Sequence, residues 1–149
     1  MPVAGRLVAI LIGYMMAVLA AALFLGLLFI SVIPLEGAPV DAYAGGLVVG
    51  TVVLAPLVGA ASFFPALCAI ALTEVFRLRD WLFHALGGGA VGLVAAVWLW
   101  ATPERNPVPS DPGFLMALVG AGMVGGMAYW VIAGRTAGEW GAKRQRREE

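Results

Sequence analysis

The sequence predicts an all-α polytopic membrane protein, with four transmembrane helices packed in a compact bundle and joined by short loops. Hydrophobic residues make up 62% of the 149 residues and charged residues only 12%, whereas soluble domains are about half apolar and a quarter charged. The apolar residues fall into four continuous runs. Each run, as a helix, is long enough to cross about 30 Å of hydrocarbon. These runs lack the two-residue alternation that is typical of a transmembrane β-barrel.

The four runs are the expected spans, and in chain order they cover residues 7–33, 44–72, 81–101 and 114–133. The last two match the roughly 20 residues that a spanning helix needs, and the first two are longer, which permits tilting. The connectors between them are too short to fold alone. We therefore expect one transmembrane domain over residues 1–149, ending in a short basic tail over residues 134–149.

The second span contains two prolines, Pro56 and Pro65. A proline inside a helix removes one backbone hydrogen bond, so we expect a kink near each. Broken helices line the substrate sites of some transporters, but such transporters usually carry a matching interruption in their second half, and the third and fourth spans contain no proline. A simple bend that fits the bundle explains the same residues.

The distribution of Lys and Arg predicts the orientation of the chain. With four spans, eight of the nine basic residues lie on the side of both termini, and only Arg105 lies on the other. Basic residues near span ends favour the cytoplasmic side. The pattern predicts a multi-pass protein of the bacterial inner membrane with both termini in the cytoplasm.

Glycines recur at four-residue spacing within three of the spans. These candidate helix-packing positions are Gly46, Gly50, Gly88, Gly92, Gly122 and Gly126. Small residues at this spacing allow close approach of helix backbones in lipid, where the hydrophobic effect between helices is weak. They indicate either packing within the bundle or docking of a helix from a partner or a second copy.

Residues that would support catalysis are missing from the centres of the spans, where no side chain is charged at neutral pH. Ion coupling and catalysis inside a membrane normally require such groups. The chain has one histidine and one cysteine, too few for a multi-thiolate metal site or a bis-histidine haem. We expect no enzyme activity, no catalytic residue, no cofactor and no metal. The formal net charge of zero also argues against nucleic acid as a partner.

Most of the internal charge lies in one stretch, residues 73–84, at the expected cytoplasmic face. If this stretch is helical, Glu74, Arg77, Asp80 and His84 share one face at three- and four-residue steps. Such a stripe predicts a cytoplasmic docking or regulatory site. The alternative is a plain turn in which Glu74 pairs with Arg77 and Asp80 with His84.

The tail contains a second group of charges, which are Lys143, Arg144, Arg146 and Arg147. Basic residues beside a membrane attract anionic lipid by about 1 kcal/mol each. These four are candidate contacts to anionic lipid, or they determine topology and do nothing further.

Residues 71–89 and the segment from Tyr129 to Gly138 are similar to small uncharacterised four-span bacterial inner-membrane proteins. The similarity covers a small part of the chain. It implies the four-span topology and no activity.

These observations favour a non-enzymatic membrane protein. The function expected is an accessory, assembly or scaffold subunit that packs against a larger membrane complex or its own copies. The alternative is a small transporter or channel organised around the proline-containing second span. The lipid bilayer and other membrane subunits, or further copies of the chain, are the expected partners.

Overall fold

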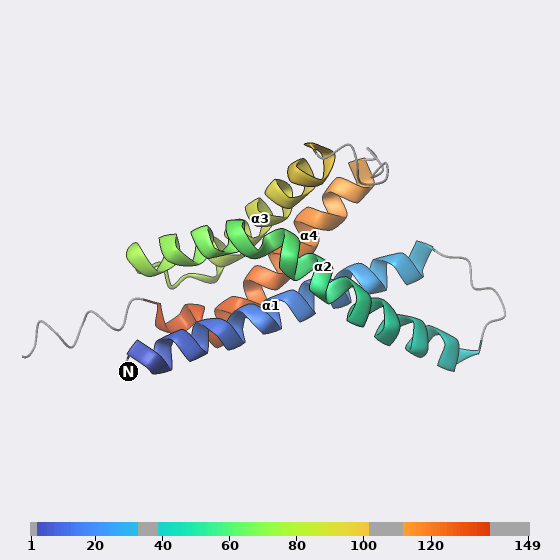
Figure 1. Ribbon diagram of the computed structural model, residues 1–149, viewed down its shortest axis with the longest axis horizontal. Coiled ribbons are helices and arrows are strands. Elements are labelled where there is room, and N and C mark those ends of the chain that lie inside the picture. The colour runs from blue at the N-terminus through green and yellow to red at the C-terminus, as the bar shows by residue number, and fades with distance from the viewer. Residues whose placement is uncertain (1–2, 33–38, 102–111, 138–149) are drawn as a thin grey trace, which may run out of the picture.

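The computed structural model describes residues 3–32, 39–101 and 112–137 (Figure 1). This part of the chain contains four α helices, one short 3-10 helix and no strand. In chain order they are α1 (Val3–Val32), α2 (Val40–Val75), α3 (Trp81–Ala101), α4 (Pro112–Ile132) and η1 (Gly134–Thr136). The all-α prediction is confirmed, and all four helices are long and apolar enough to cross a membrane.

The helices extend beyond the apolar runs at several ends. α3 coincides with the third run, whereas α1 begins at Val3 and α2 continues to Val75. These extensions take in Arg6 and Glu74, which the apolar criterion leaves out. Backbone hydrogen bonding continues a helix whether or not its side chains are apolar, so hydropathy alone underestimates its length.

Helix α4 lies at the centre of the arrangement and packs against both α3 and α1. α2 crosses α1 and contacts α3 along part of its length (Figure 1). The start of α1, the turn between α2 and α3, and η1 gather at the same end of the molecule (Figure 1). All described arginines belong to these three segments.

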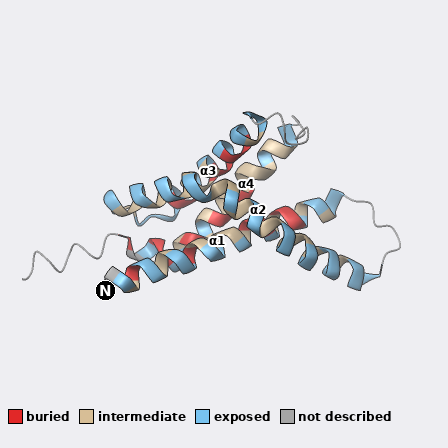
Figure 2. Ribbon diagram, in the orientation of Figure 1, coloured by how far each residue is buried: buried red, intermediate tan, exposed pale blue. Residues whose placement is uncertain are grey.

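The interior is built from small residues, and large apolar side chains face outward (Figure 2). The buried hydrophobic residues are Ala21, Ala22, Leu25, Ala85, Ala95, Ala96, Ala121, Tyr129, Ala133 and Ala137. Large apolar side chains are exposed on every long helix. Water-soluble proteins do not expose apolar surface on this scale. Small residues between helices are typical of packing in lipid.

Helix α2 differs from the others because none of its residues is buried. It runs without interruption through Pro56 and Pro65 and bends near its middle (Figure 1). Each proline lacks the N–H that would bond one turn back. The Ser62 hydroxyl also donates to the Val58 carbonyl at 2.7 Å, a contact that tends to bend helices.

The end of α2 is set by backbone geometry at Arg77, whose φ of 54° lies in the left-handed region. The Leu78 N–H donates to the Thr73 carbonyl at 3.0 Å, and the Arg77 N–H donates to the Glu74 carbonyl at 3.4 Å. This pair of bonds is a Schellman motif, which ends the helix and reverses the chain.

Candidate functional site

Helices α3 and α4 meet backbone to backbone through their glycines. A Cβ built on Gly88 would overlap the carbonyl oxygen of Gly122, and one built on Gly122 would overlap the carbonyl of Gly88. One turn away on either side, Gly92 lies against the Leu118 carbonyl and Gly126 against the His84 carbonyl. The glycines of α3 and α4 therefore pack within the bundle, one of the two roles expected of them.

Gly46 and Gly50 behave differently. Within the described residues, a Cβ added at either position would meet nothing within 4 Å. Both lie in the first half of α2, which bends away from the rest of the bundle (Figure 1). The same sequence pattern thus has two outcomes, close packing in α3 and α4 and an open surface in α2.

An ion pair joins the start of α1 to the end of α2. The Arg6 guanidinium donates to Glu74 Oε1, with Nε at 2.9 Å and Nη2 in closer contact. The two side chains are only 6% and 11% exposed. A buried pair of this kind depends on both partners, because either charge alone would be desolvated without compensation.

The stripe predicted over residues 73–84 does not form one helical face. α2 ends at Val75 and α3 begins at Trp81, so Arg77 and Asp80 lie in the connecting turn, where both are exposed. Glu74 pairs with Arg6 rather than with Arg77. The condition for a shared face, a helical stretch, is not met because the left-handed residue Arg77 breaks the periodicity, and the alternative of a turn between two spans describes the backbone. The docking role of these residues stays a prediction.

His84 and Tyr129 are buried side by side, 5% and 6% exposed. Their rings stack with centroids 5.8 Å apart and planes 23° from parallel. His84 Nδ1 lies 2.9 Å from the Asp80 carbonyl oxygen, which only accepts, so Nδ1 carries the proton. His84 Nε2 and the Tyr129 hydroxyl have no hydrogen-bond partner in the described structure. The predicted Asp80–His84 pair is thus a bond to the backbone.

Arg79 and Arg135 are linked through Trp130. The Trp130 indole N–H donates to the Arg79 carbonyl at 2.8 Å, and the Arg135 guanidinium lies 4.6 Å from the centre of the indole ring. Arg79 Nε donates to the Ala137 carbonyl at 3.0 Å. Gly134 lies between His84 and Trp130, where a Cβ would contact both rings. These contacts hold η1 against the turn between α2 and α3.

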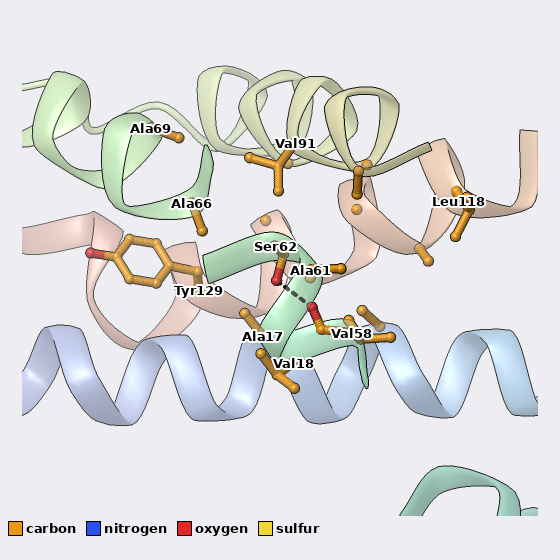
Figure 3. A pocket seen from close by; sticks show the side chains of 18 of the residues that line it. Ala17, Val18, Val58, Ala61, Ser62, Ala66, Ala69, Val91, Leu118 and Tyr129 are labelled. Atoms are coloured by element: carbon orange, nitrogen blue, oxygen red, sulfur yellow. Dashed lines mark hydrogen bonds between the residues drawn. The ribbon is translucent and has the colours of Figure 1, made fainter. Parts of the chain in front are cut away.

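A partly open cavity of about 730 Å³ lies between the four helices (Figure 3). Its lining is mostly apolar and includes Ala17, Ala61, Ala66 and Val91. At one end it reaches Thr73, Phe83 and His84, which flank the turn between α2 and α3. Its volume is in the range of pockets that bind small molecules, about 300–1,000 Å³.

Among the described residues, no group of three or more His, Cys, Asp and Glu side chains could hold a metal. Lys143, Arg144, Arg146 and Arg147 lie outside the described residues.

Sequence reasoning missed the Arg6–Glu74 pair, although one signal was available. Arg6 and Glu74 are opposite charges expected on the same membrane face, at the start of the first helix and the end of the second.

The chain matches no protein-family model, and no similar chain was found among curated proteins or solved structures.

The unpartnered hydroxyl of Tyr129 leads to a stability prediction. A buried polar group without a hydrogen bond costs about 1–3 kcal/mol, so Tyr129→Phe should leave the free energy of unfolding unchanged or raise it. The matched control is Tyr14→Phe. The Tyr14 hydroxyl donates to the Gly59 carbonyl at 2.8 Å, and its loss should cost about 1 kcal/mol. Unfolding in mild detergent measures both. A larger loss for Tyr129→Phe than for Tyr14→Phe would contradict the prediction.

Proposed function

We propose that this chain is a non-enzymatic membrane subunit of the bacterial inner membrane, with both termini in the cytoplasm. It acts as an accessory, assembly or scaffold component and docks through α2 against a larger membrane complex or another copy of itself. The observation that carries the proposal is the open glycine pair of α2, Gly46 and Gly50.

Glycine in a helix costs up to about 1 kcal/mol relative to alanine and offers no side chain for packing. In α3 and α4 the glycines at the same spacing are matched by close contact of a neighbouring backbone. In α2 the described chain supplies no such neighbour, and no residue of this helix is buried. A transmembrane helix from outside this chain fits the groove that Gly46 and Gly50 form.

The proposed orientation is supported by the charge distribution. All described arginines lie at the end of the molecule that holds the start of α1, the turn between α2 and α3, and η1 (Figure 1). Asp41, at the start of α2, is the one described charged residue that lies toward the other end of the molecule. This asymmetry agrees with the preference of basic residues for the cytoplasmic side.

The docking role is tested by filling the groove. Gly46→Leu and Gly50→Leu should remove stoichiometric partners, or the homo-oligomer, from preparations in mild detergent. Protein abundance in the membrane should not change, because both positions are open in the described structure. Ala44→Leu is the matched control, since residue 44 is exposed and lies on a different face of α2.

The readout is the mass of the complex and the proteins that co-purify with it. An unchanged complex in both leucine variants would refute docking through this groove. Equal loss of the complex in Ala44→Leu would show that any added bulk on α2 is disruptive and would also refute it.

The second candidate, a small transporter, is favoured by the cavity between the four helices. Its lining suits an apolar or amphiphilic cargo rather than an ion, because no Asp, Glu, Lys or Arg of the described chain lines it. Uptake into proteoliposomes by the isolated chain would support this function over the subunit.

A further inference from the structure

Three exposed arginines lie in or beside the turn between α2 and α3, near residues that line the cavity. Arg77 and Arg79 lie in the turn between α2 and α3, and Arg135 is brought to this turn by the contacts of Trp130. Arg79 is held through its carbonyl, which accepts from the Trp130 indole, and through its Nε, which donates to the Ala137 carbonyl. The Arg135 guanidinium lies over the Trp130 ring. This arrangement concentrates positive charge on a small surface.

The negative groups nearby do not cancel this charge. Glu74 is paired with Arg6 and is largely buried, so its charge is matched within the bundle. Asp80 is exposed, and its carboxylate accepts a hydrogen bond from the Leu82 N–H at 3.3 Å. With one exposed carboxylate beside three arginines, the described part of this surface is net positive. Arginine is well suited to phosphate because its planar donors form paired hydrogen bonds.

The turn that carries Arg77 and Arg79 lies beside apolar space. Thr73 and Phe83 line the cavity and lie on either side of the turn that contains Arg77 and Arg79. Phe76 and Trp81, next to the arginines, are exposed as well. Positive charge, exposed aromatic side chains and an apolar cavity therefore lie close together, which matches the parts of one amphiphilic molecule.

We propose that this site binds a single anionic phospholipid. Its phosphate contacts Arg77, Arg79 and Arg135, and one acyl chain occupies the cavity between the four helices. The proposal commits to a lipid rather than a soluble phosphate because Thr73 and Phe83, on either side of the turn that carries Arg77 and Arg79, line the apolar cavity. It concerns the isolated chain and does not depend on docking through α2.

The test is native mass spectrometry of the full chain in mild detergent, titrated with phosphatidylglycerol or with phosphatidylcholine of the same acyl chains. The wild-type protein should retain one phosphatidylglycerol in saturable fashion and bind phosphatidylcholine at least about tenfold more weakly. The double variant Arg77→Gln/Arg135→Gln should weaken phosphatidylglycerol binding about 25-fold, roughly fivefold for each arginine. Its affinity for phosphatidylcholine should stay the same.

The acyl-chain part is tested by filling the cavity. Ala61→Phe and, as a smaller change, Ala69→Leu both place bulk in the space that their side chains line (Figure 3). Either variant, if its thermal unfolding in detergent matches the wild type, should lose the retained lipid. A control with Lys143, Arg144, Arg146 and Arg147 all changed to Gln should keep it.

Several results would overturn the proposal. These are equal binding of the two lipids, unchanged binding in the arginine variant, or unchanged binding in both folded cavity variants. Displacement of the lipid by glycerol phosphate at equal concentration would also overturn it, because that result would mean that the acyl chain adds nothing.

Discussion

Replacing Gly88 with alanine is expected to destabilise the bundle by about 3 kcal/mol or more. The added Cβ would overlap the carbonyl oxygen of Gly122, and a backbone atom cannot move aside as a flexible side chain can. The two helices would have to separate along their whole crossing. Overpacking a tight core usually costs about 1–3 kcal/mol, and backbone contact belongs at the upper end of that range. Gly122→Ala should have the same effect from the opposite helix.

The control for this prediction is Gly46→Ala, at a position with the same sequence spacing but open surroundings. It should be neutral or slightly stabilising, because alanine is the better helix former. Unfolding by a denaturing detergent, followed by the loss of helical circular dichroism, measures all three variants. If Gly88→Ala were as stable as Gly46→Ala, the close crossing of α3 and α4 would be wrong.

Breaking the Arg6–Glu74 pair is expected to cost about 3–5 kcal/mol, because one buried charge loses its partner. Arg6→Ala and Glu74→Ala should therefore both lower the free energy of unfolding substantially. The double variant Arg6→Met/Glu74→Leu should recover most of that loss, since apolar replacement of a buried pair is often neutral. The same detergent unfolding measurement applies.

The matched control for the ion pair is Arg77→Ala. Arg77 lies close to Glu74 in sequence but is exposed in the turn, so its loss should change stability by less than about 0.5 kcal/mol. A double variant as unstable as the single ones would mean that the charges themselves are needed. A large loss in Arg77→Ala, with none in Arg6→Ala, would restore the local pairing that the sequence favoured.

The cost of losing the Arg6–Glu74 pair follows from its place in the fold. It joins residues 68 positions apart and connects the start of α1 with the end of α2. No residue of α2 is fully buried, and the pair fixes the last turn of this helix to α1. The loss of this pair should loosen the end of α2 before it affects α3 and α4.

Local physics explains why the helices were predictable. A continuous apolar run of about 20 residues is read from neighbouring residues alone, and helical hydrogen bonds also connect near neighbours. The four helices of the described chain follow the four predicted runs, and the differences are confined to polar ends such as Arg6 and Glu74. The Lys and Arg asymmetry belongs to the same class of information, because it needs only the order of the spans.

The partner of each charge and glycine was decided by the tertiary structure. Glu74 lies three residues before Arg77, so helical spacing favoured a local pair. The left-handed backbone of Arg77 ends the helix, and the crossing of α1 and α2 brings Arg6 to Glu74 instead. Nothing in the glycine spacing distinguished Gly46 from Gly88. One stays open and the other is packed, because the helix that each faces is set by how the four helices cross.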